Sequence, residues 1–487
     1  MASLEEIKQE RIKKAETLRR QGQVIYPVKV GAVSSIDSVL KKFSTSVKNQ
    51  KKLKLAGRLM AKRQQGKIIF GDLFDGTNKI QILAKQGEMK NFDLFDETVD
   101  IGDFIFLIGQ AFITKRREKT ILLSDWKMLA KSLRPLPEKW HGLKDIEEKY
   151  RRRYLDSLMT EEVRQRFIIR GRMVNTIREI LNRHDYLEFE TPILQPQAGG
   201  ATAKPFVTHH EALDVDLFLR IAPELYLKRL LIGGFPKVFE LSRNFRNEGI
   251  DVTHNPEFTM LEFYESFSDA DKQMAFTEKL IKETVKKIDK TGKLSYLDHK
   301  IDFTKPFKRI SYYDLLKRHA LLSKPESLDI KDLRIKANQL GVLVDPSDSA
   351  EKVMDGIYKK ACLPKLIQPV FVVDYPKNYL PLAKEKSDYP ELADAFQLIV
   401  AGLEIAKGFS ELNDPEEQGR RFSNQDKLSQ AGDDEAQTTD NDFISALEYG
   451  MPPAGGVGIG IDRLAMILTN QTNIREVIFF PTLRPKQ

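Results

Sequence analysis

Residues 53–130 alternate between polar and apolar positions in short runs that are typical of β-strands. Side chains along a strand point alternately to its two faces, so each run has one apolar face to bury. Turn signals such as Gln65-Gly66 and Asp75-Gly76 separate the runs. Five strands in this span predict a small closed barrel, and the five-stranded oligonucleotide-binding (OB) barrel fits best. The predicted strands are 53–60, 67–73, 79–83, 103–113 and 120–129.

The segment before these strands predicts a charged helix over residues 4–21, in which apolar positions are sparse. Residues 1–54 hold 13 Lys or Arg and 5 Asp or Glu, a net charge of +8, which equals the net charge of the whole chain. The positive excess is therefore concentrated at the N-terminus. Two interpretations stay open: a helix with a solvated face, or an electrostatic arm that contacts a nucleic-acid backbone.

Beyond the barrel the pattern mixes helices with longer strands. Pro135 and Pro137 mark the start of a predicted linker, and residues 160–184 predict a helix with Thr160 as its N-cap. Because strands and helices do not alternate regularly, the sheet is predicted to be antiparallel and the fold class α+β. The strand-like runs are 237–242, 258–266, 369–375 and 396–403, whereas 270–365 is more helical and predicts an insertion.

Composition narrows the class of protein. The chain has 487 residues, enough for two or three domains, and its 30% charged and 41% hydrophobic residues are typical of soluble proteins. The single cysteine, Cys362, excludes a disulfide framework and a cysteine-based zinc site within one chain. No apolar run approaches the roughly 18 residues that span a bilayer, and the N-terminus lacks a signal-peptide core. We therefore expect a cytoplasmic protein without a membrane partner.

One candidate functional segment is a predicted hairpin. A strand over 237–242 leads into Asn244–Gly249, and a second strand returns from Glu257. Strand periodicity places Phe258, Met260, Glu262 and Tyr264 on one face. A carboxylate among apolar residues needs a partner when buried. Either Glu262 pairs with a neighbouring arginine for structural reasons, or it serves a ligand.

A second segment, Gly455–Gly460, runs into a predicted helix over 461–470. Glycines allow backbones and ligands to approach closely. A dinucleotide-binding loop is excluded because the spacing is Gly-Val-Gly-Ile-Gly and only 27 residues follow, too few for a long βαβ unit. The chain also lacks the Gly-x4-Gly-Lys-Ser/Thr sequence of a P-loop.

Together the two segments resemble motifs 2 and 3 of the class II aminoacyl-tRNA synthetases. Residues 186–192 resemble motif 1, and the sequences at 199–232, 408–414 and 431–436 are similar to the lysyl-tRNA synthetase branch. The resemblance covers nearly the whole chain. It implies an antiparallel class II catalytic sheet flanked by helices and preceded by an OB-fold barrel. The implied domains are a basic helical arm (1–50), an OB-fold anticodon-binding domain with linker (51–150) and a catalytic domain (151–487) with an insertion at about 270–365.

The resemblance implies a lysine–tRNA ligase. Such an enzyme uses ATP to activate L-lysine as lysyl-adenylate, and then transfers the lysyl group to the 3′ end of tRNA(Lys). The activating step is an in-line attack of a carboxylate on the α-phosphorus, so the protein supplies positioning and charge stabilisation rather than a nucleophile. Motif 1 additionally implies a homodimer.

By resemblance, each substrate has its own set of residues. Arg246 and Arg463 would be catalytic: Arg246 would bridge the lysine carboxylate and the α-phosphate, as a bidentate guanidinium can. Arg463 would also stack on adenine with Phe258, while Glu248 would accept from the adenine amino group and His254 would lie near the terminal phosphates. Glu404, with Gln397 as a doubtful second ligand, would hold Mg²⁺. The implied lysine-binding residues are Gly200 and Glu224 at the α-ammonium, Glu262, Tyr264 and Glu411 at the ε-ammonium, and Arg246, Lys407 and Phe409.

In the barrel, Phe70 and Gln81 match the pattern that binds the central anticodon uridine, and Asp125 occupies a position that also contacts the anticodon. An aromatic ring stacks the base and an amide contacts its edge. The alternative for Phe70 is a place in the barrel core.

Several positions depart from the family pattern. Lys407 stands where the family usually has Asn, Gln397 where it has Glu, Ala395 where it has a basic residue, and Leu380 where it has Ser; Asp125 replaces a longer Glu. Two alternatives to a working ligase therefore stay open. One is a catalytically impaired or altered tRNA-binding protein; the other is a paralogue that activates a lysine analogue, although such paralogues lack the barrel.

Overall fold

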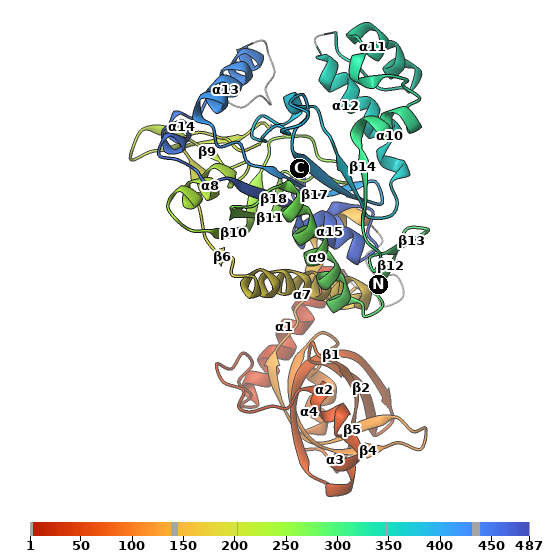
Figure 1. Ribbon diagram of the computed structural model, residues 1–487. Helices are drawn as coiled ribbons and strands as arrows, with labels where there is room; N and C mark the ends of the chain where they lie inside the picture. Colours follow the sequence, from red (N-terminus) through yellow and green to blue (C-terminus); the bar gives the residue numbers. More distant parts are fainter. Residues whose placement is uncertain (1–2, 138–144, 202, 347, 431–438, 487) are drawn as a thin grey trace. The chain divides into compact units, whose positions relative to one another are not determined.

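The computed structural model describes residues 3–137, 145–201, 203–346, 348–430 and 439–486 (Figure 1). It divides into two compact units, Met1–Leu143 and Lys144–Gln487, each with its own hydrophobic core. The division into arm, barrel and catalytic domain at residues 50 and 150 stays a prediction. None of the helices in the described ranges is both long and apolar enough to cross a membrane.

The N-terminal unit is built on five strands that form a closed barrel in the order β1-β2-β3-β5-β4. The predicted barrel is confirmed. β1 runs five residues beyond its predicted end, because Ala61–Gln65 pair with β2 although their side chains show no apolar alternation. The strands are β1 (Lys52–Gln65), β2 (Ile68–Phe74), β3 (Lys79–Lys85), β4 (Phe104–Ile113) and β5 (Lys119–Ala130).

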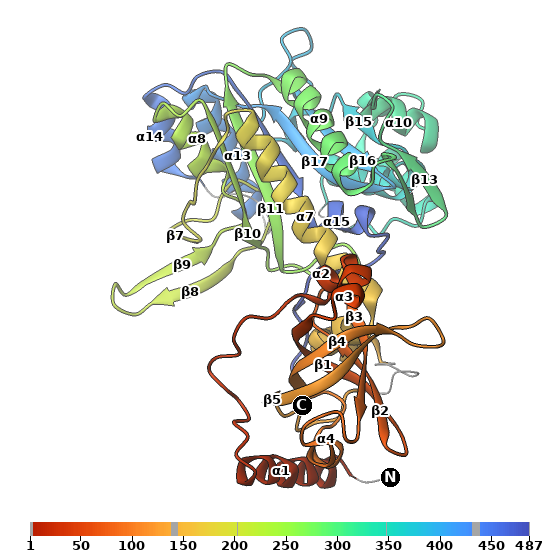
Figure 2. The same cartoon turned by 90° about the horizontal axis from the view of Figure 1, so that it is seen from below.

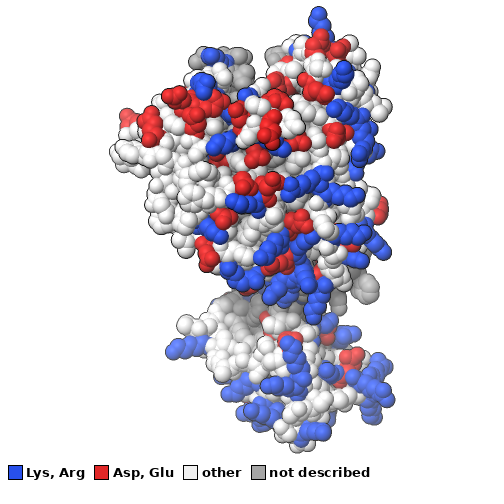
Figure 3. Space-filling model, viewed as in Figure 1, with Lys and Arg blue, Asp and Glu red and all other residues white. Residues whose placement is uncertain are grey.

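The predicted N-terminal helix, α1 (Leu4–Arg20), packs against the rest of this unit. Ala15 and Leu18 are buried, and the buried Arg11 guanidinium donates to the carbonyl of Ser132 at 2.7 Å. One face of α1 is therefore buried against this unit, so the helix is neither solvated on all sides nor a free arm. Other basic side chains remain outside, and Lys and Arg outnumber Asp and Glu on the face of this unit in the lower part of Figure 3. Three short helices complete the unit: α2 (Ile36–Lys41), α3 (Phe43–Asn49) and α4 (Phe92–Thr98).

The C-terminal unit is built on an eight-stranded sheet in the order β14-β15-β16-β17-β18-β11-β10-β6. The five inner pairs, from β15·β16 to β11·β10, are antiparallel, as predicted, whereas the pairs at the two edges are parallel. The two-residue strand β6 is too short for a periodic signal. The strands are β6 (Leu187–Glu188), β10 (Lys237–Phe245), β11 (Glu257–Ser266), β14 (Lys308–Ser311), β15 (Val370–Val373), β16 (Ala395–Val400), β17 (Leu403–Ser410) and β18 (Ala454–Gly460).

Three helices, α7 (Glu161–Arg183), α9 (Ala270–Ile288) and α15 (Ile461–Leu468), cover one face of this sheet (Figure 2). Leu261 and Phe263 of β11 point into the core they form. Tyr264 points to the opposite face, where it packs with α8 (Glu224–Ile232). Thr160 precedes α7 at the N-cap position, as predicted, but its side chain makes no capping hydrogen bond.

The segment predicted as an insertion has two parts. Helix α9 and the hairpin of β12 (Lys293–Tyr296) and β13 (His299–Asp302) contribute to the main core, whereas α10 (Tyr312–His319), α11 (Ile330–Gln339) and α12 (Ala350–Ala361) form a separate cluster with β15. The limits at 270 and 365 stay a prediction. The unit also contains α5 (Ile146–Arg151), α6 (Arg153–Met159), α13 (Pro415–Gln430), α14 (Asn441–Glu448) and a small sheet of β7 (Leu194–Gln195), β8 (Phe206–His210) and β9 (Val215–Leu219).

A buried ion cluster supports the barrel. The Lys131 ammonium is fully buried and lies 2.6 Å from a carboxylate oxygen of Asp100 and 2.7 Å from one of Asp103. It also donates to the Thr98 carbonyl at 2.6 Å. Removing one partner of such a cluster leaves uncompensated buried charge.

We expect Lys131→Met to lower the free energy of unfolding of the N-terminal unit by about 3 kcal/mol, because the fully buried Asp103 carboxylate loses its ion-pair partner. Both tryptophans, Trp126 and Trp140, precede residue 144, so tryptophan fluorescence during urea unfolding reports on this unit. The exposed Lys51→Met variant is the control. An unchanged unfolding midpoint in Lys131→Met would contradict the expectation.

Candidate active site

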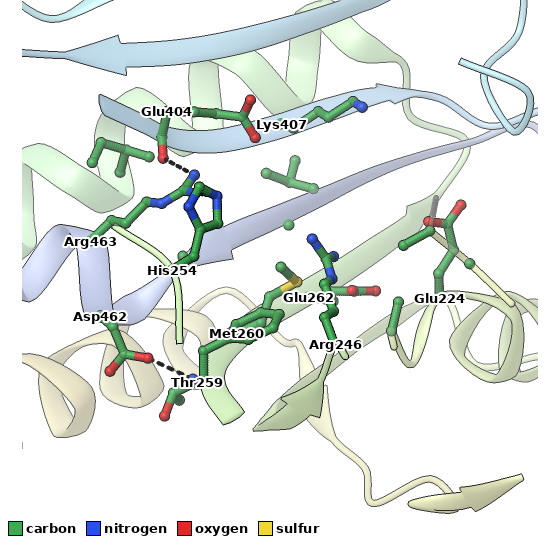
Figure 4. Close-up of a pocket in the computed structure, with 18 of the residues that line it drawn as sticks. Glu224, Arg246, His254, Thr259, Met260, Glu262, Glu404, Lys407, Asp462 and Arg463 are labelled. Carbon is green, nitrogen blue, oxygen red and sulfur yellow. Dashed lines mark hydrogen bonds between the residues drawn. The ribbon is translucent and has the colours of Figure 1, made fainter. Parts of the chain in front are cut away.

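A pocket opens on the face of the sheet opposite α7, α9 and α15, and Figure 4 shows part of its lining. It gathers residues from α8, the β10–β11 connection, β11, β17, β18 and the start of α15. Most of the residues predicted for ATP and amino-acid binding line it: Gly200, Glu224, Arg246, Glu248, His254, Phe258, Glu262, Tyr264, Glu404, Lys407, Phe409, Glu411 and Arg463. The structure thus brings together segments separated by more than 200 residues, although it does not test their individual roles.

Strand β11 supplies the floor of this pocket. Phe258, Met260, Glu262 and Tyr264 all line it, which confirms the predicted shared face. Glu262 has no arginine partner among the described residues. Glu240, directly opposite Glu262 on β10, pairs with Arg220 at 2.6 Å, whereas the charge of Arg246 acts on Glu262 only from beyond ion-pair distance. The structural alternative, an arginine pair for Glu262, is therefore wrong.

Residue 456 must be glycine for the carboxylate end of the pocket to exist in this form. Gly456 lies on β18 opposite Tyr264 of β11 on one side and Phe409 of β17 on the other. A Cβ atom there would lie 2.1 Å from Oε1 of Glu411 and 2.3 Å from a ring carbon of Tyr264. Both distances are far below van der Waals contact, so a side chain would displace both pocket residues.

Arg246 lies in the connection after β10. Its backbone amide donates to the Pro256 carbonyl at 2.9 Å, which closes the connection at its base. Its guanidinium carbon lies 5.1 Å from the centre of the Phe258 ring, and no carboxylate among the described residues comes within ion-pair distance. Burial lowers the pKa of Arg246, although guanidinium remains charged in proteins. A poorly solvated cation without a counter-ion favours an anionic ligand.

Arg463 lies at the end of the pocket opposite Glu224, and Arg246 lies between them in the view of Figure 4. Its guanidinium donates to the Glu404 carbonyl at 3.2 Å and to Nε2 of His254 at 2.9 Å. Because arginine can only donate, Nε2 must be the acceptor, so the His254 proton lies on Nδ1. Nδ1 in turn donates to Asp251 at 2.9 Å. This chain of hydrogen bonds holds Arg463 and His254 toward one end of the cavity.

Asp462 positions Arg463 and was missed by the sequence analysis. Its carboxylate is buried, accepts from the Thr259 amide at 2.7 Å and pairs with Arg170 of α7 at 2.7 Å. It thereby fixes the first turn of α15 to β11. An Asp in the first helical turn is commonplace on a surface, so the sequence carried no distinguishing signal.

Three carboxylates converge at the other end of the pocket, from Glu224, Glu262 and Glu411. The Tyr264 hydroxyl donates to Oε2 of Glu262 at 2.9 Å. Burial, followed by the charge of Glu224, raises the pKa of Glu262 to about 8. Burial also raises the pKa of Glu411 well above its usual range, although the nearby Lys228 ammonium opposes this rise. Such concentrated negative charge favours a cationic ligand.

Lys228 was likewise missed. Its side chain is fully buried, and its ammonium pairs with Glu224 at 2.7 Å and contacts Glu411. Helical periodicity could have revealed it, because Glu224, Leu227, Lys228 and Leu231 fall on one stripe at spacings of three and four. All four are buried.

The positions that depart from the family pattern lie in different places. Lys407 and Leu380 line the pocket, whereas Gln397 and Ala395 are absent from its lining. Gln397 stands opposite Lys407 across β16 and β17, and its amide oxygen accepts from the Tyr375 hydroxyl at 2.8 Å. Ala395 is buried opposite Phe409. The Gln397 amide oxygen is thus hydrogen-bonded to a tyrosine and does not face the pocket as a metal ligand would.

The described residues contain no group of three or more His, Cys, Asp or Glu arranged to hold a metal ion. The Glu404 carboxylate faces the pocket without an ion-pair partner among them. Mg²⁺ is commonly held by substrate phosphates together with one or two carboxylates. One free carboxylate therefore fits an ion that arrives with a phosphate ligand, but not a resident metal.

In the barrel, Phe70 and Gln81 both lie on the outer face. The buried positions of β2 and β3 alternate with them, and their cross-strand partners, Leu83 and Asp72, also face outward. The alternative that placed Phe70 in the barrel core is therefore wrong. The Gln81 amide oxygen accepts from Thr120 at 2.8 Å. A surface hollow includes Gln81, Arg63, Lys79, Arg117 and Lys119 in its lining, but neither Phe70 nor the partly exposed Asp125 of β5.

Comparisons with known proteins agree with this geometry. Residues 145–484 match the family "tRNA synthetases class II (D, K and N)", and residues 53–129 match "OB-fold nucleic acid binding domain". A lysine–tRNA ligase of Carboxydothermus hydrogenoformans is 47% identical over 485 residues, which cover 99% of each chain.

Two other lysine–tRNA ligases are similar over almost the same length. That of Methanoculleus marisnigri is 44% identical and covers 97% of this chain and 94% of its own. That of Syntrophomonas wolfei is 43% identical and covers 99% of this chain and 98% of its own. The resembling sequence at 431–436 lies outside the described residues. The chain belongs to the class II tRNA synthetases of the D, K and N group, joined to an N-terminal OB-fold domain.

Proposed function

We propose that this chain is a lysine–tRNA ligase, which activates L-lysine with ATP and transfers it to the 3′ end of tRNA(Lys). The similarity of lysine–tRNA ligases over nearly the full chain supports this activity. The observation that supports it most directly is that one pocket contains both a buried cation and a cluster of carboxylates. The Arg246 guanidinium has no carboxylate partner among the described residues, and Glu224, Glu262 and Glu411 line one end of the same pocket.

In this proposal ATP lies between the two arginines. Arg246 bridges the α-phosphate and the carboxylate of lysine, so the attacking oxygen is held in line with the phosphorus. Arg463 and Phe258 stack on the two faces of adenine, and Glu248 accepts from its amino group. His254 lies toward the terminal phosphates, and its Nε2 donates to a phosphate oxygen once it has taken up a proton and released its bond from Arg463. Charge that develops on the phosphate meets donors already in place, which lowers the barrier.

Lysine then extends from Arg246 toward the carboxylate end. Glu224 and the Gly200 carbonyl accept from its α-ammonium, while Glu262, Tyr264 and Glu411 accept from its ε-ammonium. Phe409 borders this end, and Lys407 pairs with the substrate carboxylate in place of the usual Asn. An amino acid with an apolar side chain would leave buried carboxylates unpaired, and such mismatches allow discrimination of about 10⁴-fold or more.

Mg²⁺ belongs to the proposal as an ion bound to the ATP phosphates. Glu404 is the residue that would hold it, and the ion would neutralise phosphate charge. Gln397 adds little, because an amide is a weaker ligand than a carboxylate and this one already accepts from Tyr375.

The macromolecular partner is tRNA(Lys). The OB-fold match supports anticodon binding on the outer barrel face, where Phe70 stacks the central base and Gln81 contacts its edge. Asp125 stays a proposed contact on β5.

A homodimer formed around motif 1 is a further part of the proposal. The exposed apolar side chains of Leu187, Ile193, Leu194, Val207 and Phe235 support it, because an interface would bury them. A cytoplasmic location follows from a role in translation.

The impaired-synthetase alternative finds no support in the comparisons. Two of the four departures it rested on, Gln397 and Ala395, lie outside the pocket lining. Lysine-dependent exchange between ATP and pyrophosphate separates the two functions. Robust exchange supports the ligase, whereas absent exchange with intact tRNA binding would favour the alternative.

We expect Arg246→Gln to reduce kcat/KM in lysine-dependent ATP–pyrophosphate exchange by about 10²-fold or more, because the transition state loses a charged donor. Arg172→Gln, an exposed substitution on α7, is the matched control and should leave the rate unchanged. Wild-type exchange rates in Arg246→Gln would refute the role assigned to this guanidinium.

We expect Gly456→Ala to reduce kcat/KM for lysine roughly 10²-fold, because a Cβ atom displaces Glu411 and Tyr264, and small misplacements have effects of this size. The Kd for ATP alone should change little. Gly171→Ala on α7, where a Cβ atom meets nothing within 4 Å, serves as the control. Equal loss of ATP and lysine binding would instead indicate general unfolding of the site.

A further inference from the structure

A fully buried lysine of the protein lies beside the carboxylate end of the pocket. The Lys228 ammonium is 2.7 Å from Oε1 of Glu224, one turn earlier on α8, and contacts Oε2 of Glu411, which follows β17. It also lies 5.5 Å from the centre of the Phe409 ring, a favourable position for a cation. Lys228 itself is absent from the pocket lining.

This ammonium engages one oxygen of each carboxylate. Oε1 of Glu411 lies directly against Gly456 and has no hydrogen-bond partner among the described residues. Oε2 of Glu224 likewise makes no hydrogen bond to Lys228. The same lysine therefore anchors both side chains and leaves an oxygen of each for a ligand.

The charges at this end balance in the empty pocket only when carboxylates of the cluster are protonated. Glu224, Glu262 and Glu411 carry three negative charges when ionised, and Lys228 supplies one positive charge. Lysine brings two ammonium groups, which equals the remaining deficit. Other groups facing the cluster are Tyr264, which donates to Glu262, Arg246, whose charge lowers the pKa of Glu262, and Glu240, which Arg220 already neutralises.

We propose that Lys228 is a positioning residue that holds Glu224 and Glu411 in place in the empty pocket and favours the carboxylate form of Glu411, so that the site accepts an amino acid with two ammonium groups. The inference rests on the proposed roles of Glu224 and Glu411 in binding lysine. Lys228 does not touch the substrate; it acts through the two carboxylates. Without it, buried carboxylates would take up protons and would have to lose them again when lysine binds.

The direction of the pH effect follows from the charges. The Lys228 ammonium lowers the pKa of the Glu411 carboxyl, against a larger rise from burial. Removing the ammonium raises that pKa, so more of Glu411 is protonated near pH 7. Protonated Glu411 cannot accept from an ammonium in the same way, and raising the pH restores the carboxylate. The defect should therefore be largest at low pH and shrink as the pH rises.

The test measures KM for lysine in ATP–pyrophosphate exchange between pH 6.5 and 8.5 for the full-length wild type and Lys228→Met. We expect KM to rise about 30-fold or more at pH 7 in the variant, and the ratio of variant to wild type to fall as pH increases. Lys228→Gln, which keeps a hydrogen-bond donor without the charge, should behave in the same way. The Kd for ATP should change little in both variants.

Lys131→Met is the matched control, because Lys131 is also fully buried between two carboxylates but belongs to the barrel. It should leave the pH dependence of KM for lysine unchanged. A pH-independent ratio in Lys228→Met would assign Lys228 a purely structural role, and a lower KM would mean that it competes with the substrate. Either result overturns the proposal. Absent lysine-dependent exchange in the wild type would instead overturn the proposed function.

A measurement on the wild type needs no variant. Calorimetry of lysine binding at pH 7, in buffers of different ionisation enthalpy, gives the number of protons released. Lys228 pairs directly with Glu224 and Glu411, whereas Glu262 has no cationic partner at ion-pair distance among the described residues, so the proposal predicts release of about one proton or fewer per lysine. Release of about two protons would show that the Lys228 ammonium does not favour the carboxylate form of Glu411, and would refute the proposal.

Discussion

The active site depends on a surplus of buried negative charge that the protein only partly neutralises. Three carboxylates from α8, β11 and the end of β17 converge, and a single internal ammonium lies among them. Burying unpaired carboxylates is costly, so the arrangement lowers the stability of the empty pocket and favours a cationic ligand. Arg246, drawn between Arg463 and Glu224 in Figure 4, is by contrast a buried cation without a carboxylate at ion-pair distance among the described residues. The unpaired carboxylates match the ammonium groups of a cationic amino acid, and the unpaired guanidinium matches its carboxylate and a neighbouring phosphate.

The sheet makes this arrangement possible because its two faces have different tasks. On β11, Leu261 and Phe263 enter the core beneath α7, α9 and α15, while Glu262 and Tyr264 project into the pocket. The neighbouring strand β18 has glycine at 456, 458 and 460, so these positions add no side chain to the pocket. The missing side chain at Gly456 leaves the volume that Glu411 and Tyr264 occupy. A rigid apolar face thus fixes polar groups that would otherwise repel one another.

Much of this architecture is predictable from sequence because its signals are local. Alternation along 53–130 predicted the barrel, and strand periodicity predicted the shared face of Phe258, Met260, Glu262 and Tyr264. The resemblance to class II synthetases brought Arg246 and Arg463 into one site before any geometry was known. The two-residue edge strand β6 cannot be predicted from the sequence, because it is defined by its hydrogen bonds to β10 and is too short to have a periodic pattern of its own.

The residues that escaped prediction act through other residues. Asp462 fixes the start of α15, and Arg220 neutralises Glu240, but on sequence alone each is an ordinary charged residue. Lys228 adjoins Arg229, and the pair suggests a solvated helix face. Only the spacing of Lys228 from Leu227 and Leu231, which places all three on one buried face of α8, indicates that Lys228 is buried. A departure from a family pattern does not by itself show where a residue lies: Gln397 accepts a hydrogen bond from Tyr375 outside the pocket lining.

The most direct test of the central claim, that buried carboxylates select a cationic side chain, compares L-lysine with its neutral counterpart L-norleucine in ATP–pyrophosphate exchange. The two side chains have similar length and differ mainly in the terminal ammonium. Selection by the buried carboxylates should make kcat/KM for lysine exceed that for norleucine by about 10⁴-fold or more. Comparable values for the two amino acids would contradict it.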